Sequence, residues 1–156
     1  MNCGQACEGE RLLLCYEQKN LDFYDNAIVE DVWVCAQEIG LEVIPYELDF
    51  DPVIDVVPKH LEAAIAAADL TVFLARLADQ MRFGRFKSGQ RIILSHALNS
   101  ASLASPFGTV HYKASLALRQ VIDAAVFGAG EVVVSCKAGT YFKGRIAASP
   151  DGGDVN

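Results

Sequence analysis

Short apolar runs alternate with segments of helical periodicity along most of this 156-residue chain. Continuous apolar stretches predict buried β-strands at residues 11–16, 41–48, 70–75, 91–95 and 131–136, with a sixth strand at 141–147. Apolar side chains that recur every three to four positions predict helices at 22–39 and 109–127, and an alanine-rich segment predicts a third helix at 59–68. Gly40 stands where a helix C-terminal cap belongs, and Thr109 can cap the helix that follows it. Pro45 favours either an edge position or a bulge for its strand.

This alternation of strands and helices predicts the fold class. Strands that are apolar along their whole length are typical of a parallel sheet with both faces covered. The sequence therefore predicts an α/β fold of three layers, a Rossmann-like, mainly parallel sheet with helices on both faces. Residues 1–148 are expected to form a single domain. Residues 149–156, with the sequence SPDGGDVN, have the composition of a tail or linker and are expected to lead toward a second domain absent from this chain.

Composition excludes several classes of protein. A hydrophobic fraction of 52% is too high for an intrinsically disordered chain. A net charge of -7 argues against a nucleic-acid partner, because binding to phosphates needs an excess of Lys and Arg. No apolar run approaches the ~20 residues that span a bilayer, so no membrane association is expected. The five cysteines show no disulfide-framework pattern, which favours a reducing compartment and a cytoplasmic location.

The charge is distributed unevenly along the chain. Residues 1–62 hold fourteen acidic and three basic side chains, whereas residues 63–156 hold six acidic and ten basic ones. Half of those ten bases fall between Arg76 and Arg91. This basic segment is either a solvated loop surface or the mouth of a site that attracts an anionic ligand or an acidic neighbour.

Candidate site residues follow from the rule that open parallel sheets bind ligands at the carboxyl ends of their strands. This rule nominates Tyr16, Glu17 and the segments 76–82, 96–99 and 137–140. The candidate ligand-binding residues among them are Arg76, Asp79, Arg82, His96, Asn99, Lys137 and Thr140. His96 is the best candidate for proton transfer, and it is expected within reach of Arg76 or Asp79. The alternative is that His96 only satisfies a nearby backbone group.

The sequence lacks the motifs of dinucleotide, phosphate and metal sites. The turn after the first strand, YEQKNLD at 16–22, has none of the glycines of a dinucleotide site, and no phosphate-binding loop occurs. No spacing typical of metal ligands is present, so neither a cofactor nor a metal is expected in this chain. Cys136 is either a buried strand cysteine or, beside Lys137, a thiol with a lowered pKa.

Four segments together carry a resemblance to a known family. They read GERLLL at 9–14, AADLTV at 67–72, GQRIIL at 89–94 and VVSCKAGT at 133–140. In this order and spacing they resemble the N-terminal α/β domain of the aminopeptidase T-like metallopeptidase superfamily, which also includes dihydroxypyridine ring-cleaving dioxygenases. The resemblance implies that metal ligands for zinc, cobalt or iron lie in a second domain beyond this chain. It also implies that the loop from Arg76 to Arg82 faces the active-site cleft.

Three functions therefore stay open. The first is the cleft-forming domain of a two-domain, metal-dependent aminopeptidase-like hydrolase that is inactive alone. The second is the corresponding domain of a mononuclear-iron ring-cleaving dioxygenase, and the third is a stand-alone module for a small ligand or a protein partner. Expected partners are a small molecule or peptide at the strand ends, and either a homodimer partner or a C-terminal domain. Apolar residues in the carboxyl-end loops are expected to form an exposed docking patch: Phe83, Phe86, Leu98, Leu103 and Phe107.

Overall fold

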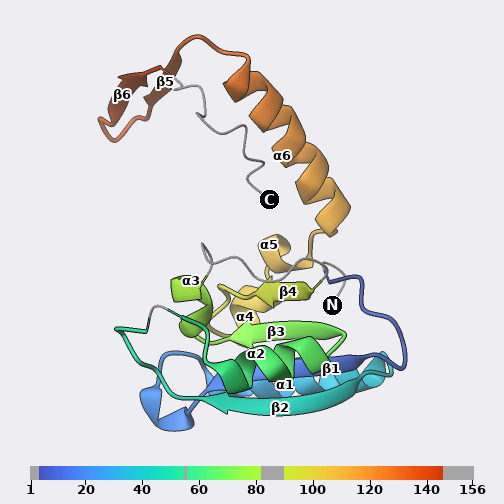
Figure 1. Cartoon of the computed structure of the whole chain (residues 1–156). Helices are drawn as coiled ribbons and strands as arrows, with labels where there is room; N and C mark the ends of the chain where they lie inside the picture. The colour runs from blue at the N-terminus through green and yellow to red at the C-terminus, as the bar shows by residue number, and fades with distance from the viewer. Residues whose placement is uncertain (1–3, 55, 82–89, 146–156) are drawn as a thin grey trace. The chain divides into compact units, whose positions relative to one another are not determined.

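The structure is a computed structural model that describes residues 4–54, 56–81 and 90–145 (Figure 1). The chain divides into two compact units, residues 1–111 and residues 112–156. Within the described residues, no helix is long and apolar enough to cross a membrane.

The first unit is built on a four-stranded parallel sheet. Its strands are β1 (Arg11–Glu17), β2 (Glu42–Leu48), β3 (Leu70–Leu74) and β4 (Arg91–Leu94), in the spatial order β2-β1-β3-β4. The helices of this unit are η2 (Lys19–Leu21), α1 (Asn26–Glu38), α2 (Lys59–Ala67), α3 (Leu77–Met81), α4 (Ser100–Leu103) and α5 (Pro106–Thr109). The predicted α/β class, with a parallel sheet flanked by helices, is confirmed.

Alternate side chains of β1 enter two separate hydrophobic cores. Leu12 and Leu14 belong to a core with Ile28, Val32 and Ala36 of α1. Leu13 and Cys15 belong to a second core with Leu61 and Ile65 of α2 and with Phe73 of β3. Because successive side chains of a strand point to opposite faces, α1 and α2 cover opposite faces of the sheet. Figure 1 shows α2 in front of the sheet and α1 behind it.

The ends of α1 follow from local sequence. The Asp25 carboxylate accepts a hydrogen bond from the Ala27 backbone N–H at 3.0 Å, so the helix begins after Asp25 and not at Asp22 as the periodicity predicted. At the other end Gly40 has a φ of +80°, as the predicted cap requires. The Gly40 N–H donates to the Gln37 carbonyl and the Leu41 N–H donates to the Ala36 carbonyl, which is the Schellman pattern.

The predicted edge position of Pro45 is confirmed, because β2 is an outer strand of the sheet. The Glu42 N–H donates to the Glu10 carbonyl, so Glu42 directs its backbone groups toward β1. Peptide groups of a strand alternate in direction, and Pro45 is three residues further along. The nitrogen of Pro45 therefore faces away from β1, where the missing N–H costs no ladder hydrogen bond.

The second unit contains α6 (Tyr112–Phe127) and the strands β5 (Val132–Ser135) and β6 (Tyr141–Gly144). The two strands pair antiparallel, with Val133 opposite Lys143. Because β5 pairs with β6 in a separate sheet, the expectation that the fifth strand extends the parallel sheet is wrong. Five residues connect β5 to β6, whereas a parallel pair needs a crossover of a dozen residues or more.

The start of the last long helix also differs from the prediction. Residues up to Thr109 form the separate short helix α5, and α6 begins at Tyr112. Ser105 provides the cap of α5, since its hydroxyl accepts a hydrogen bond from the Gly108 N–H. The Thr109 hydroxyl instead donates to the Ser105 carbonyl, so Thr109 closes one helix and does not begin the next.

Candidate functional site

The ends of β1 and β3 bring Glu17 and Arg76 into a buried ion pair. The Glu17 side chain is only 3% exposed and that of Arg76 is 23% exposed. Arg76 Nη2 lies 2.8 Å from Glu17 Oε2, and Arg76 Nε lies 3.0 Å from both carboxylate oxygens. The Arg76 backbone N–H also donates to Glu17 Oε1. A carboxylate at the end of an apolar strand is thus fully paired, as a buried charge must be.

Two aromatic rings enclose the Arg76 guanidinium. Its carbon atom Cζ lies 3.7 Å from the centroid of the Phe50 ring and 4.5 Å from the centroid of the Phe23 ring. Phe23 belongs to the loop between η2 and α1, and Phe50 belongs to the loop after β2. Arg76 therefore joins three segments at the carboxyl edge of the sheet through one ion pair and two cation–π contacts. The positive charge of Arg76 is therefore already paired with Glu17 within the protein and is not a free binding site for an anion.

The predicted proximity of His96 to the segment after β3 is present in the structure. His96 Nδ1 lies 3.6 Å from Asp79 Oδ1, with the two side chains 65% and 49% exposed. Asp79 belongs to α3 and His96 directly follows the loop residue Ser95 after β4. Neighbouring parallel strands deliver both residues to one edge, as the argument from strand order required.

Tyr24 lies beneath this edge. Its hydroxyl donates to the Ser95 carbonyl at 3.3 Å, next to His96. Burial raises the pKa of Tyr24 to about 12, and the negative charges of Asp79 and Glu17 act in the same direction. The phenol therefore stays protonated across the physiological range and serves as a hydrogen-bond donor.

The other predicted site residues take different places. The Asn99 side chain caps α4 by accepting a hydrogen bond from the Ser102 N–H at 2.8 Å, which is a structural role. Arg82, like Phe83 and Phe86, lies outside the described residues. Lys137 and Thr140 belong to the β5–β6 turn of the second unit. They were candidates because they follow the fifth predicted strand, but this strand pairs with β6 and is not part of the described parallel sheet. Of the expected docking patch, Leu98 is exposed, whereas Leu103 packs against the core on the α1 face.

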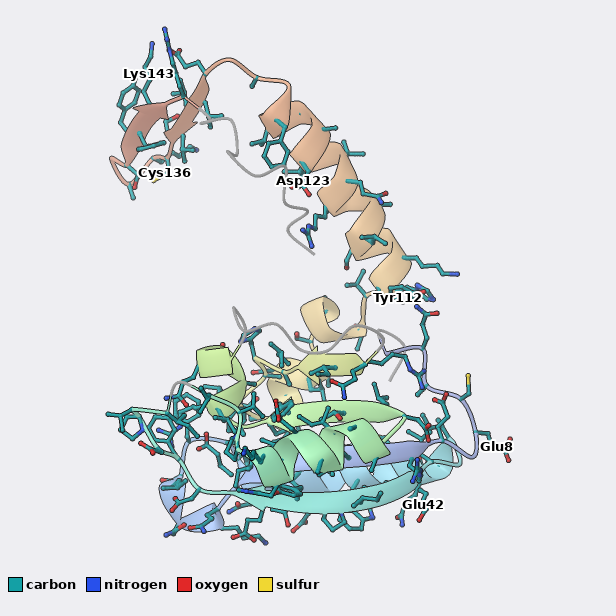
Figure 2. The ribbon with its side chains drawn as sticks, viewed as in Figure 1. Glu8, Glu42, Tyr112, Asp123, Cys136 and Lys143 are labelled. Carbon is teal, nitrogen blue, oxygen red and sulfur yellow. The ribbon has the colours of Figure 1, made fainter. Side chains whose placement is uncertain are left out.

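Cys136 occupies the same turn and is exposed, so the interpretation as a buried strand cysteine is wrong (Figure 2). A hydrogen bond from the Thr140 side chain lowers the pKa of the Cys136 thiol, and the backbone of the turn at Thr140, Ala138 and Gly139 adds to the effect. The turn is closed by the Cys136 N–H on the Thr140 carbonyl and by the Gly139 N–H on the Cys136 carbonyl. The backbone geometry thus holds the sulfur among donors that favour the thiolate.

We expect Cys136 to be alkylated by iodoacetamide faster than Cys7 and Cys35, which are also exposed, at neutral pH. A lowered pKa means that more thiolate is present at neutral pH, which outweighs its weaker intrinsic nucleophilicity. Cys15 should not react in the folded protein, because burial raises its pKa to about 12. Site-resolved rates are read by peptide mass spectrometry after timed quenching.

The control for this prediction changes only the hydrogen bond. Thr140→Val should slow the alkylation of Cys136 and move its pH midpoint upward, whereas Thr140→Ser should retain the native rate. Equal rates in the wild type and in Thr140→Val would contradict the assigned cause.

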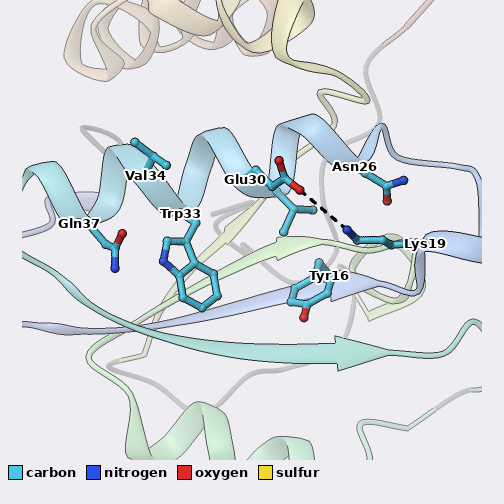
Figure 3. Close-up of a pocket in the computed structure, with 8 residues that line it drawn as sticks. Tyr16, Lys19, Asn26, Glu30, Trp33, Val34 and Gln37 are labelled. Carbon is cyan, nitrogen blue, oxygen red and sulfur yellow. Dashed lines mark ion pairs between the residues drawn. The ribbon is translucent and has the colours of Figure 1, made fainter.

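A pocket that the sequence did not reveal lies between α1 and the carboxyl end of β1. Its volume is about 510 Å³. Figure 3 shows the rings of Trp33 and Tyr16 beneath α1, with the ion pair of Lys19 and Glu30 on the helix side of Tyr16. The strand-end rule nominates Tyr16, but for the helix side of the pocket the sequence offers only the spacing of Trp33 and Val29, which share a helix face four residues apart. The same spacing is typical of ordinary core contacts, so it could not identify a pocket.

The chain was compared with known proteins in three ways. No family model matches it, no curated protein matches it, and no solved structure matches it. Among the residues that the structure describes, no three His, Cys, Asp or Glu side chains are grouped as metal ligands.

Proposed function

We propose that this chain is the cleft-forming α/β domain of a metal-dependent, aminopeptidase-like hydrolase, and that it is inactive without a metal-binding domain. The four segments quoted above support the family. The parallel sheet supports it too, because it directs the exits of β1, β3 and β4 to one edge. The described residues hold no set of three metal ligands, so the proposal assigns the metal to that other domain.

The observation that carries this proposal is the pair Asp79 and His96 at the carboxyl edge. An aminopeptidase recognises the positively charged α-ammonium group of its substrate. The half-exposed carboxylate of Asp79 can attract that group, and the imidazole of His96 beside it is suited to proton exchange. The Glu17–Arg76 pair and the two flanking rings hold the end of β3, from which α3 and Asp79 follow. Asp79 and His96 would form one wall of the substrate cleft.

A titration of the labelled protein with two matched dipeptides tests the proposal. Leu-Gly has a free α-ammonium group, whereas in N-acetyl-Leu-Gly this group is replaced by an uncharged amide. We expect Leu-Gly to shift the amide signals of Asp79 and His96 in a saturable way, and we expect the acetylated peptide not to do so. Asp79→Asn should weaken the binding of Leu-Gly about fivefold, the range of one partly exposed charge contact. Asp123→Asn, a surface carboxylate of α6, is the matched control.

Three results would contradict the proposal. They are equal binding of the two dipeptides, no binding of either, and unchanged binding by Asp79→Asn. Hydrolysis of Leu-p-nitroanilide by this chain alone with added zinc, cobalt or iron would overturn the statement that it is inactive by itself.

The proposal also covers the layer arrangement of the domain, its cellular compartment and its docking partner. A three-layer arrangement is supported by the placement of α1 and α2 on opposite faces of the sheet. A cytoplasmic location is supported by the free thiols of Cys7, Cys15, Cys35 and Cys136. Docking to a C-terminal domain or to a second copy is supported by exposed apolar side chains in the second unit, such as Val121, Phe127 and Phe142.

A further inference from the structure

The pocket beside α1 is built differently from the carboxyl-edge site. Tyr16 and Glu17 are consecutive in β1, so their side chains point to opposite faces of the sheet. Tyr16 contributes to the pocket on the α1 face, whereas Glu17 pairs with Arg76. A ligand in the pocket would therefore not contact Arg76 through Glu17, and the two sites can be tested separately.

The lining of the pocket defines a class of ligand. Trp33 from α1 and Tyr16 from β1 supply two aromatic walls, and Val29 supplies an aliphatic one. The side-chain amides of Asn26 and Gln37 supply donors and acceptors at the pocket. A volume of about 510 Å³ is larger than one benzene ring needs and lies in the range of small-molecule sites. Aromatic walls with a few hydrogen-bonding groups favour a planar ring system that is larger than one ring.

The charge around the pocket restricts this class further. Lys19 and Glu30 neutralise each other at the pocket, with Nζ and Oε1 3.8 Å apart. The exposed surface of α1 beside it also carries Asp31 and Glu38. This acidic surface disfavours an anionic ligand. It also disfavours a symmetric contact with the same face of a second copy, which would bring an equally acidic helix to the same place.

We propose that the pocket between α1 and β1 binds a planar, two-ring aromatic molecule that is uncharged or cationic. The ring system stacks between Trp33 and Tyr16, and a polar group on the molecule bonds to the amide of either Asn26 or Gln37, which lie at opposite ends of the pocket. The proposal does not depend on the hydrolase assignment.

The chain has a single tryptophan, so one indole N–H signal in a ¹⁵N spectrum reports directly from this pocket. The probes are indole, tryptamine and indole-3-acetate, which share one ring system and are neutral, cationic and anionic. Indole and tryptamine should shift the Trp33 signal in a saturable way. Indole-3-acetate should bind about fivefold more weakly than tryptamine, as one unfavourable surface charge implies.

Filling the pocket provides the matched test. Val29→Phe should weaken the binding of tryptamine about tenfold, because the larger ring takes up ligand space. Val53→Phe is the control, since Val53 is 82% exposed and does not line the pocket. Asn26→Phe also fills the pocket, but from an exposed position. It replaces Val29→Phe in the binding test if Val29→Phe does not fold. Asp79→Asn should leave tryptamine binding unchanged, which separates this pocket from the carboxyl-edge site.

The proposal is overturned if the Trp33 signal does not shift in a saturable way with indole or tryptamine. It is also overturned if the folded filled variants bind tryptamine as tightly as Val53→Phe does. Tighter binding of indole-3-acetate than of tryptamine would overturn the charge assignment.

Discussion

Replacing Arg76 with alanine is expected to lower the free energy of unfolding of the first unit by about 3–5 kcal/mol, because it leaves a buried carboxylate without its partner. The Glu17 side chain is 3% exposed, and Arg76 provides three of its hydrogen-bonding contacts through Nε and Nη2. The substitution also removes the cation between the rings of Phe23 and Phe50. Urea unfolding followed by Trp33 fluorescence measures the loss.

Two comparisons separate the ion pair from general damage at Arg76. Lys19→Ala breaks an ion pair whose side chains are 71% and 74% exposed, and it should cost less than about 1 kcal/mol. The double variant Glu17→Gln, Arg76→Met removes both charges, and it should be more stable than Arg76→Ala alone. A loss below about 1 kcal/mol for Arg76→Ala would show that the carboxylate finds other partners.

The parallel sheet could be predicted because its strands have a simple signature. The stretch Leu12–Cys15 is apolar without alternation, since α1 covers one face of β1 and α2 covers the other. Turn chemistry added precision at Gly40, where only a residue that tolerates positive φ fits the end of α1. Helix α1 starts four residues later than predicted, because apolar periodicity does not specify which acidic residue caps it.

The hairpin could not be distinguished from a buried strand by the same rule. Val133 and Val134 form an apolar run like that of β1, yet they are 51% and 49% exposed in the second unit. A short apolar run gives the type of element but not its neighbour. The helices α3, α4 and α5 have only four or five residues each, too few to show a helical repeat.

The candidate site was predictable only where strand order determines it. The contact of Asp79 with His96 follows from two consecutive parallel strands with exits at one edge. The pairing of Glu17 with Arg76 does not follow from strand order, because the two residues are 59 positions apart and no sequence spacing connects them. The charge of Arg76 therefore looked available to an anionic ligand, whereas the fold uses it to satisfy a buried acid. Asn99 resembled a ligand-binding residue for a similar reason and is a helix cap.

The central strand β1 supports both cores, and this makes Leu13 a second position of large effect. Its side chain is 1% exposed and lies in one core cluster with Leu61, Ile65 and Phe73. Leu13→Ala removes three carbon atoms from a site closed by the sheet on one side and by α2 on the other. The surrounding helix and strands cannot collapse fully into the space. We expect the free energy of unfolding to fall by about 3–5 kcal/mol, the sum of lost burial and a residual cavity.

Leu98 offers a matched control for this substitution within the same unit. Its side chain is 42% exposed, so Leu98→Ala removes the same atoms with little loss of burial and should cost less than about 1 kcal/mol. Leu13→Met keeps the volume nearly constant and should cost less than about 1.5 kcal/mol. Urea unfolding of the three variants gives the comparison, provided that the slope with denaturant is unchanged. If Leu13→Ala and Leu98→Ala lowered the stability equally, Leu13 would not lie in a closed core, and the packing of α2 against this face of β1 would have to be abandoned.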